Sequence, residues 1–432
     1  MAESGRLVKW SYQFGGHEGP TVRGGRLEGL PPSRHHLAPR ARIVFMRAHH
    51  RLPFTAALLL ATAAALAAPG DREPSSAALE GTWVAGDCHA HVRPGDQDGH
   101  IWATIDTTVA AARLEGVRWM ILTPHFWRGR ANEDGRVAAL ARFHDDVGAR
   151  NRAAATAGDR GAPLLIPGLE ETRQDPGHLG LSFLDLREAW AGRDAHGGSL
   201  ALEARARGAF LVLNHPYGQI VADMSWKPWT SGREPGDEAR AITERADAIE
   251  VYNGMMATGE RLLRRPRERW QSERAIAAID RAGLAGRRLV GVGGSDDHQT
   301  VFFKATTWAL VRGPLTEGSL LEALRAGRVV CGASPAASSF WGASDRHPDL
   351  VPPGAAIEAD REVRLRWTGR AELWRDGVSL GERNGGLTDA IEPGTRHVYR
   401  IVVSSRAGPS YANPIFVNLA QRAGARAKTE AF

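Results

Sequence analysis

The sequence predicts a mixed α/β fold in which a parallel sheet or barrel precedes a small module of β-strands. Two observations support this prediction. Between residues 81 and 334, apolar runs typical of strands alternate with Ala/Arg-rich helical patterns, and repeated helix-then-strand units are typical of parallel α/β sheets. After Pro335, short strand-like runs separated by turn residues replace the helical patterns, which indicates a β-sandwich-like module.

Charge is distributed unevenly along the chain of 432 residues. The first 70 residues hold nine Lys/Arg and three Asp/Glu, which accounts for the whole net charge of +6. The remainder contains 46 basic and 46 acidic residues. Because that larger part is neutral, its charge favours neither a nucleic acid nor a membrane surface as a partner.

The N-terminal 80 residues are predicted to lie outside the folded domains. Residues 46–69 have the order of a secretory signal peptide, with a basic start at Met46 and an apolar run from Leu52 to Ala67. The run is short for a membrane span, and a buried Ala-rich helix is the alternative interpretation. If translation begins at Met46, residues 1–45 are a spurious or disordered extension and the protein is exported, to the periplasm or the medium.

The expected elements follow from this pattern. Residues 70–80 form a polar linker, residues 81–335 the α/β domain, residues 355–420 the β module, and residues 421–432 a loose tail. Predicted helix-then-strand units are 110–115 with 119–123, 202–207 with 209–214, and 275–282 with 288–293. In the module, strands are expected at 362–367, 371–374, 397–404 and 415–419, with turns at 375–377 and 384–386.

Candidate metal ligands follow the first predicted strand. In an extended chain His89 and His91 point to the same side, so the two imidazoles can bind one cation. Asp87 is expected to accept a hydrogen bond from a ligand imidazole. Asp96 and Asp98 in the next loop offer a further carboxylate. The chain has only two cysteines, Cys88 inside this motif and Cys331, so a disulfide scaffold is excluded and at most one bridge can form.

The other predicted strands end in the same residue types. Because such ends meet at one edge of a parallel sheet, we expect these side chains to converge. Imidazoles mixed with carboxylates favour Zn, Mn or Fe. Nine candidate ligands are too many for one four-coordinate site, so two or three divalent ions are expected. The further candidates are His125, Glu170 with Glu171, His178, His215, Asp296 and His298.

These segments resemble the motifs of the PHP (polymerase and histidinol phosphatase) superfamily. Its D-x-H-x-H, T-[DP]-H, G-x-E, N-H-P and G-S-D-x-H segments occur here in the same order between residues 82 and 334. The segment that ends at residues 412–417 resembles the small β-module of the branch named for carbaryl hydrolase. Pro124 replaces the aspartate that most members carry before the second-motif histidine, as in the bacterial tyrosine-phosphatase branch.

The resemblance implies a distorted seven-stranded (β/α) barrel that holds a trinuclear metal site. It favours Asp98 over Asp96 as the loop ligand, because the family places this acid before a glycine. The implied ligands are His89, His91, Asp98, His125, Glu170, His178, His215, Asp296 and His298.

The predicted function is hydrolysis of a phosphate ester by a metal-bridging hydroxide, with Asp296 and His298 as catalytic residues. Alternatives are carbamate, ester or amide hydrolysis at the same site, and a non-catalytic exported protein that binds a metal or a carbohydrate. Arginine forks match phosphate oxygens, although loop arginines are as often simply solvated. The candidate substrate contacts are Tyr217, Asn253, Arg128 and Arg130.

Overall fold

The computed structural model describes residues 80–127, 133–173, 175–187, 199–219, 224–299, 306–333 and 339–419. All of them belong to one compact unit, which runs from Arg72 to Phe432. The expected signal peptide, the extension before it and the C-terminal tail lie outside the described residues. Within the described ranges, none of the helices combines the length and the apolar character that a membrane crossing requires.

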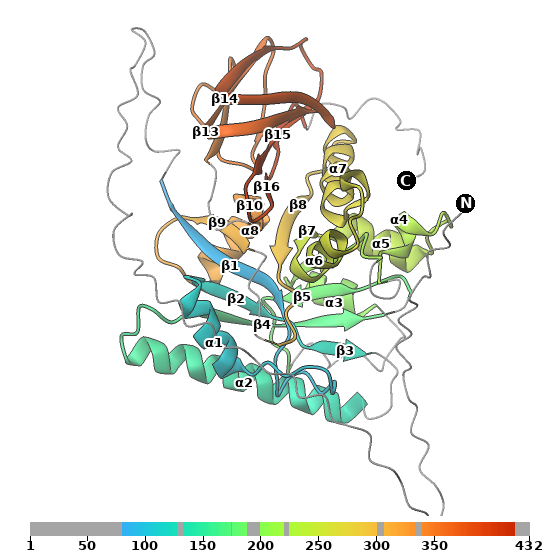
Figure 1. Ribbon diagram of the computed structural model, residues 1–432, viewed down its shortest axis with the longest axis vertical. Coiled ribbons are helices and arrows are strands. Elements are labelled where there is room, and N and C mark those ends of the chain that lie inside the picture. The colour runs from blue at the N-terminus through green and yellow to red at the C-terminus, as the bar shows by residue number, and fades with distance from the viewer. Residues whose placement is uncertain are drawn as a thin grey trace, which may run out of the picture. The chain divides into compact units, whose positions relative to one another are not determined.

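A curled, barrel-like sheet carries the α/β part of the chain (Figure 1). Strand β1 (Thr82–Ala90) pairs in parallel with β2 (Trp119–Leu122), and β2 pairs in parallel with β4 (Leu164–Thr172). The short strand β3 (His125–Trp127) also lies parallel to β4. These strands are almost wholly buried, as expected for a sheet that is covered on both faces.

The sheet continues through β5 (Leu179–Ser182), β6 (Phe210–Leu213), β7 (Ala248–Asn253) and β8 (Val290–Gly294). The last three are parallel, whereas β5 runs antiparallel to both β4 and β6. The expectation of a parallel (β/α) sheet is therefore met only in part. Only residues 173–178 separate β4 from β5, and a parallel crossover needs about a dozen or more residues.

Two contacts determine how the sheet curls. A bridge between Ala90 and Asp297 brings the segment after β8 next to the end of β1. On the same edge, away from β2, β1 pairs antiparallel with β9 (Thr306–Val311), which pairs antiparallel with β10 (Val329–Gly332). The carboxyl ends of strands from opposite parts of the sheet are thus placed near one another. The number of seven barrel strands stays a prediction.

Helices cover the sheet where apolar residues recur at helical spacing. In α7 (Gln271–Leu284), Ala275, Ile276 and Ile279 are buried and the helix packs against β7. Two helices begin with a capping box, α1 at Thr104 and α8 at Thr316. The bounds are α1 Ile105–Leu114, α2 Glu133–Thr156, α3 Leu200–Ala206, α4 Lys227–Thr230, α5 Asp237–Arg245, α6 Gly254–Leu262 and α8 Glu317–Arg325.

The C-terminal strands extend the same sheet. Strand β16 pairs antiparallel with β10, and β15 pairs with β13, β16 and β17. Figure 1 shows β13 and β14 as a long hairpin above the barrel strands. The sandwich-like form of this part stays a prediction. The bounds are β11 Phe340–Ser344, β12 Ala356–Ile357, β13 Glu362–Arg375, β14 Val378–Ala390, β15 His397–Ser404, β16 Pro409–Ala412 and β17 Ile415–Val417.

Two details of this part differ from the prediction. The expected strands at 362–367 and 371–374 form one strand, β13, and the expected turn at 384–386 lies within β14. The glycines there face an irregularity in β13, where the register shifts between Arg366 and Arg370, so the two strands stay paired. The other turn is confirmed, because Asp376 and Gly377 have φ angles of 56° and 80° between β13 and β14.

Buried polar contacts attach the C-terminal strands to the barrel. Asn413 donates to the carbonyl oxygens of Gly291 and Val329 and accepts from the Gly291 amide at 2.6 Å. The Nε atom of Arg400 in β15 lies 3.0 Å from Oδ2 of Asp280 in α7. Both side chains are almost inaccessible, at 2% and 3% exposed, and burial raises the pKa of Asp280 even beside the arginine.

Replacement of Arg400 by Met is expected to destabilise the protein by roughly 3–5 kcal/mol, because it leaves Asp280 buried and unpaired. The double variant Arg400→Met/Asp280→Leu should recover most of that loss, since it removes both charges. The unfolding free energies of the single and the double variant are measured by urea titration, with tryptophan fluorescence as the signal. A single variant that loses less than about 1 kcal/mol would contradict the structural role of this pair.

Glu260 in α6 predicts a pH dependence of stability. Its Oε1 accepts a hydrogen bond from the Gln271 amide at 2.7 Å at the start of α7, and burial raises its pKa to about 7. A raised carboxyl pKa favours the folded state fully below the unfolded value, and this contribution is lost as the pH rises through the folded value.

The unfolding free energy of the parent should therefore fall between pH 5 and pH 8 by about 2 kcal/mol more than that of Glu260→Gln. The glutamine keeps an acceptor for the Gln271 amide but cannot ionise. Urea titrations of both proteins at the two pH values measure the difference. If the unfolding free energies of the two proteins change equally with pH, the pKa of Glu260 is not raised by folding.

Candidate metal centre

The histidines and carboxylates that follow the predicted strands converge in one buried cluster. They come from β1 and the segment after it, from β3 and β4, and from the segments before β5 and after β6 and β8. Overlapping groups of ligand atoms lie within 4.8 Å of one another. We call these side chains the metal cluster: His89, His91, Asp96, His125, Glu170, His178, His215, Asp296 and His298.

Glu170 lies at the centre of the metal cluster. Its Oε1 is 3.3 Å from Nδ1 of His178, 3.3 Å from Nε2 of His215 and 3.4 Å from Nε2 of His89. Its Oε2 is 3.5 Å from Nε2 of His125. One carboxylate thus touches imidazoles that four separate parts of the sheet supply. This is the arrangement expected of a carboxylate that bridges two cations.

Asp296 and Asp96 complete the other side of the metal cluster. Oδ1 of Asp296 lies 3.1 Å from Nε2 of His91 and 3.5 Å from Nε2 of His89. Oδ2 of Asp96 lies 3.2 Å from Nδ1 of His91 and 2.7 Å from Nδ1 of His125, whose backbone amide it also accepts at 2.9 Å. His91 is therefore held between two carboxylates.

These separations are those of a shared coordination sphere. Two ligand atoms that each lie about 2.1 Å from one tetrahedral cation are about 3.4 Å apart. The closest pair of ring nitrogens, Nε2 of His89 and Nε2 of His91, is 3.1 Å apart. His215 is fully buried, yet neither of its ring nitrogens makes a hydrogen bond within the described part of the chain. Divalent cations would satisfy both features.

The carboxylates and imidazoles of the metal cluster shift one another's pKa strongly. Burial lowers the pKa of His89, but Asp296, Glu250 and Glu170 raise it well above its usual value. Burial alone would raise the pKa of Glu170, but the facing His178 and His89 hold it well below its usual value, so it is ionised. Burial and the neighbouring His91 lower the pKa of His298 to about 3. Its imidazole is therefore neutral near pH 7, which is the form that binds a metal.

Local backbone strain marks the same positions. His215 and Asp296 have φ angles of 27° and 54°, which are unfavourable for residues with a Cβ atom. Next to them, a Cβ atom on Gly294 would lie 2.3 Å from Cβ of His89. Only glycine permits β8 to approach β1 this closely, and that approach brings Asp296 to the two histidines of β1.

The structure places both loop carboxylates beside the histidines. Asp98, the loop ligand that the resemblance favours, forms a candidate ligand group with His100 and His125, and Asp96 lies closer to His91 and His125. Asp98 also accepts hydrogen bonds from Nε1 of Trp127 at 2.6 Å and from Arg136 at 3.2 Å. Its Oδ2 is 3.9 Å from Nδ1 of His125, at the edge of the metal cluster. Sequence spacing alone did not distinguish two acids on one loop.

Asp87 also has another role than the one expected. Its Oδ1 accepts the backbone amides of His89 and Ser295, at 2.9 and 3.0 Å, and so joins β1 to the segment after β8. The partner of the His89 imidazole is Glu250 in β7, with Oε1 3.2 Å from Nδ1. Glu250 was missed as a site residue because it lies inside β7, before the polar residue Asn253 that ends the strand.

The two predicted substrate contacts that the structure describes, Tyr217 and Asn253, are both buried and have protein partners. Tyr217 stacks on Trp229 and lies under Arg274, so its contacts are with the helical layer. Asn253 is buried and donates from Nδ2 to Asp296 and Glu250, at 3.1 Å each. It therefore positions two carboxylates. Arg128 and Arg130 lie outside the described residues.

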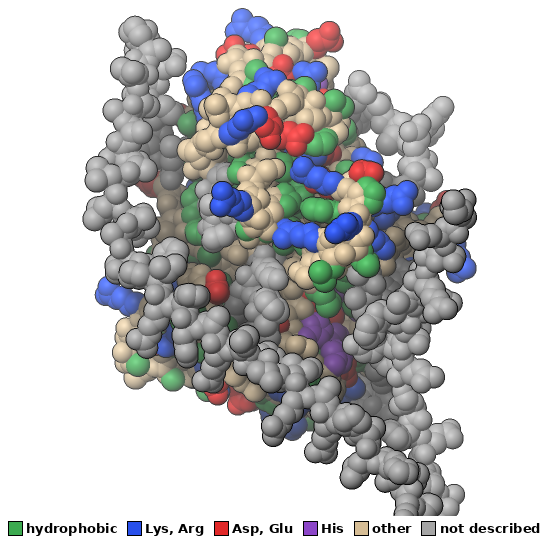
Figure 2. Space-filling view, in the orientation of Figure 1, with side chains coloured by type: hydrophobic (Ala, Val, Ile, Leu, Met, Phe, Trp, Pro, Cys, Tyr) green, Lys and Arg blue, Asp and Glu red, His purple; other side chains and the backbone are tan. Residues whose placement is uncertain are grey.

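The metal cluster opens to solvent on the side of His298. The side chain of His298 is 16% exposed and that of Asp98 is 11% exposed, whereas those of Glu170 and His215 are at most 1% exposed. His100 is exposed and its ring lies 5.2 Å from that of His298. Figure 2 shows histidine side chains at the surface on the face that it presents.

Comparison with known proteins adds little to these observations. No protein-family model and no curated protein matches the chain. Among solved structures, it is similar to endonuclease Q in complex with a 27-mer duplex substrate with an abasic lesion at the active site, at 10% sequence identity and a TM-score of 0.35. The match covers 56% of this chain and 57% of that chain. A TM-score of this size does not establish a shared fold, so the family stays a prediction from the motifs.

Purified protein is expected to contain two or three divalent ions per chain, and Glu170→Gln should contain at least one fewer, because it removes the shared carboxylate. Glu171→Gln is the matched control, since adjacent strand residues point to opposite faces. Elemental analysis after dialysis counts the ions. Chelation should also lower the thermal midpoint of the parent by roughly 5–10 °C. Equal metal content in both variants would exclude Glu170 as a ligand.

Proposed function

We propose that this protein is a metal-dependent hydrolase that acts on a phosphate ester at the metal cluster. The observation that supports this proposal is the position of Glu170, one buried carboxylate between imidazoles from four parts of the sheet. Clusters of this composition suit Zn, Mn or Fe. Bound cations of this kind lower the pKa of a coordinated water, so that it becomes nucleophilic near neutral pH.

Neighbouring side chains hold the candidate metal ligands in fixed orientations. Asn214 donates to Oε1 of Glu170 at 2.9 Å, and Asn253 donates to Oδ2 of Asp296 at 3.1 Å. Glu250 accepts the His215 amide at 2.8 Å while its other oxygen faces His89. Such partners fix the orientation of the ligand side chains, and their loss usually weakens metal binding or activity by about 10–100-fold.

His298 is the group of the metal cluster best placed to meet a substrate. Its Nδ1 donates to the carbonyl oxygen of Asp296 at 2.8 Å, because a carbonyl can only accept. Its Nε2 therefore carries the lone pair, and the side chain is the one that reaches solvent. A substrate that enters beside His298 and Asp98 would present its reacting centre to Asp296, which supports the predicted catalytic roles of Asp296 and His298.

A phosphate ester fits the expected charge better than a neutral substrate. Divalent cations held at the metal cluster would attract the anionic oxygens of a phosphate ester more strongly than a neutral group. A carbamate or amide carbonyl can be polarised by the same site. The two substrate classes are therefore separated by experiment.

The full chain, loaded with Zn or Mn, should hydrolyse a chromogenic phosphate mono- or diester in preference to a naphthyl carbamate. Asp296→Asn should lower kcat/KM by about 10³-fold, because it removes a charge at the reacting centre. Asp297→Asn is the matched control, since this neighbour lies outside the metal cluster and accepts the Gln299 amide.

Three outcomes contradict the proposal in different ways. Turnover of the carbamate alone moves the protein to carbamate or amide hydrolysis. If kcat/KM falls equally in Asp296→Asn and Asp297→Asn, the Asp296 carboxylate contributes to folding and not to the reaction. Stoichiometric metal with no turnover of any substrate class would support the alternative of a non-catalytic metal-binding protein.

A further inference from the structure

A second concentration of charge lies apart from the metal cluster. A cavity of about 550 Å³ is lined by residues of α3, α5 and α8 and of the segments that lead into β7 and β8. Its volume is within the range of small-molecule binding sites, about 300–1,000 Å³. We call this cavity the arginine pocket, after the residues that dominate its wall: Arg205, Arg245, Arg287, Arg288 and Arg325.

The arginine pocket lies at the opposite end of the parallel strands from the metal cluster. Asp247, which lines it, directly precedes β7, whereas Asn253 at the metal cluster ends that strand. Arg288 likewise precedes β8, and Asp296 follows it. A ligand in the arginine pocket would therefore not touch the cations of the metal cluster.

Positive charge in the arginine pocket is not balanced. Five arginines face two carboxylates, those of Glu244 and Asp247, which leaves three positive charges. Asp247 is 2.8 Å from Arg205 and also accepts the Leu211 amide, so it is already committed. Its other arginine neighbour, Arg325, is 4.0 Å away. A cavity wall with this excess attracts an anion.

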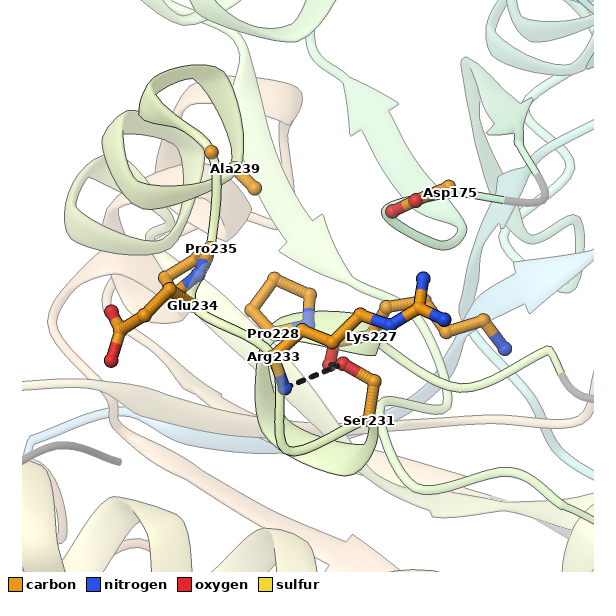
Figure 3. A pocket seen from close by; sticks show the side chains of 9 residues that line it. Asp175, Lys227, Pro228, Ser231, Arg233, Glu234, Pro235 and Ala239 are labelled. Carbon is orange, nitrogen blue, oxygen red and sulfur yellow. Dashed lines mark hydrogen bonds between the residues drawn. The ribbon is translucent and has the colours of Figure 1, made fainter.

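A different cavity, shown in Figure 3, provides a comparison. It has a volume of about 350 Å³, and its wall holds the acids Asp175 and Glu234 and the bases Lys227 and Arg233. Asp175 lies across the cavity from the segment between α4 and α5 (Figure 3). Charges of both signs are equal in number there, so this cavity has no electrostatic preference for an anion.

Backbone carbonyl groups hold the guanidinium groups of the arginine pocket in place. Arg287 donates to the carbonyl oxygen of Ala246 at 3.1 Å, Arg288 to that of Arg325 at 3.0 Å, and Arg325 to that of Gly208 at 2.6 Å. A carbonyl dipole fixes a guanidinium without neutralising it. Each group therefore keeps its charge and N–H donors that are already oriented, which reduces the entropy cost of binding an oxyanion.

Part of the wall of the arginine pocket is shielded from solvent, since the side chains of Arg205 and Arg325 are 34% and 35% exposed. The Nε atoms of Arg205 and Arg325 are buried and have no hydrogen-bond acceptor within the described ranges. Burial also lowers the pKa of Arg287, and the neighbouring Glu244 offsets this only in part. An oxyanion in the cavity would offer these guanidinium groups an acceptor.

We propose that the arginine pocket binds a small molecule that carries a phosphate or pyrophosphate group. Arginine forks match phosphate oxygens in a bidentate manner. A nucleic acid is disfavoured because it needs an extended basic surface, and the chain beyond residue 70 has equal numbers of basic and acidic residues. The site is independent of the proposed hydrolysis, since its residues lie away from the metal cluster.

Inorganic pyrophosphate is the probe, titrated calorimetrically into the full chain after its metals have been removed. Metal-free protein prevents the probe from binding at the metal cluster. The parent should bind one equivalent, and Arg245→Glu/Arg288→Glu should bind at least tenfold more weakly. The matched control is Arg152→Glu/Arg312→Glu, which changes the net charge equally at exposed positions that do not line the arginine pocket and should bind like the parent.

Several results would overturn this proposal. One is undiminished binding in the pocket variant with an unchanged thermal midpoint. Another is equal weakening in the control variant, which would indicate a general charge effect. Binding that appears only after metal is restored would place the probe at the metal cluster. A single-stranded oligonucleotide that binds while pyrophosphate does not would assign the surface to nucleic acid instead.

Discussion

The structure depends above all on the carboxylate of Glu170. It is buried, it is ionised, and imidazole nitrogens surround it at 3.3 to 3.5 Å. Histidines packed this closely around one another would be costly in a protein interior without cations to share their lone pairs. Strands β1, β3, β5 and β6 each carry or border one of these rings, and their pairing around β4 brings the rings to one point.

The fold meets that need by departing from a regular barrel. The short connection from β4 makes β5 antiparallel, and this places His178 beside Glu170 at the start of the returning strand. Gly294 lets β8 approach β1, and the strained backbone of His215 and Asp296 turns their side chains toward the cluster. Strain of this kind persists only where surrounding contacts hold it, and here Glu250, Asn253 and Asn214 supply them.

The two ends of the parallel strands carry different ionisable groups. Carboxylates and imidazoles collect at the carboxyl ends of β6, β7 and β8, and guanidinium groups collect at their amino ends. The carboxylates and imidazoles could bind cations, whereas the arginines outnumber the carboxylates beside them. The two ends are therefore suited to different ligands. The C-terminal strands lie against this body through the β10–β16 pairing and the buried Arg400–Asp280 pair, which makes them part of one sheet.

The sequence by itself determined which residue types follow which strands, because hydrophobic periodicity is local and each run ends where a polar group can face the edge of the sheet. That was enough to group His89, His91, His125, Glu170, His178, His215, Asp296 and His298. Tertiary structure alone decided that Asp96 makes the shorter contact with His125, that Glu250 is the partner of His89, and that Tyr217 faces the helices. It also assembled the arginine pocket from four separate segments. These outcomes depend on which faces meet across the sheet, and no local pattern specifies such long-range contacts.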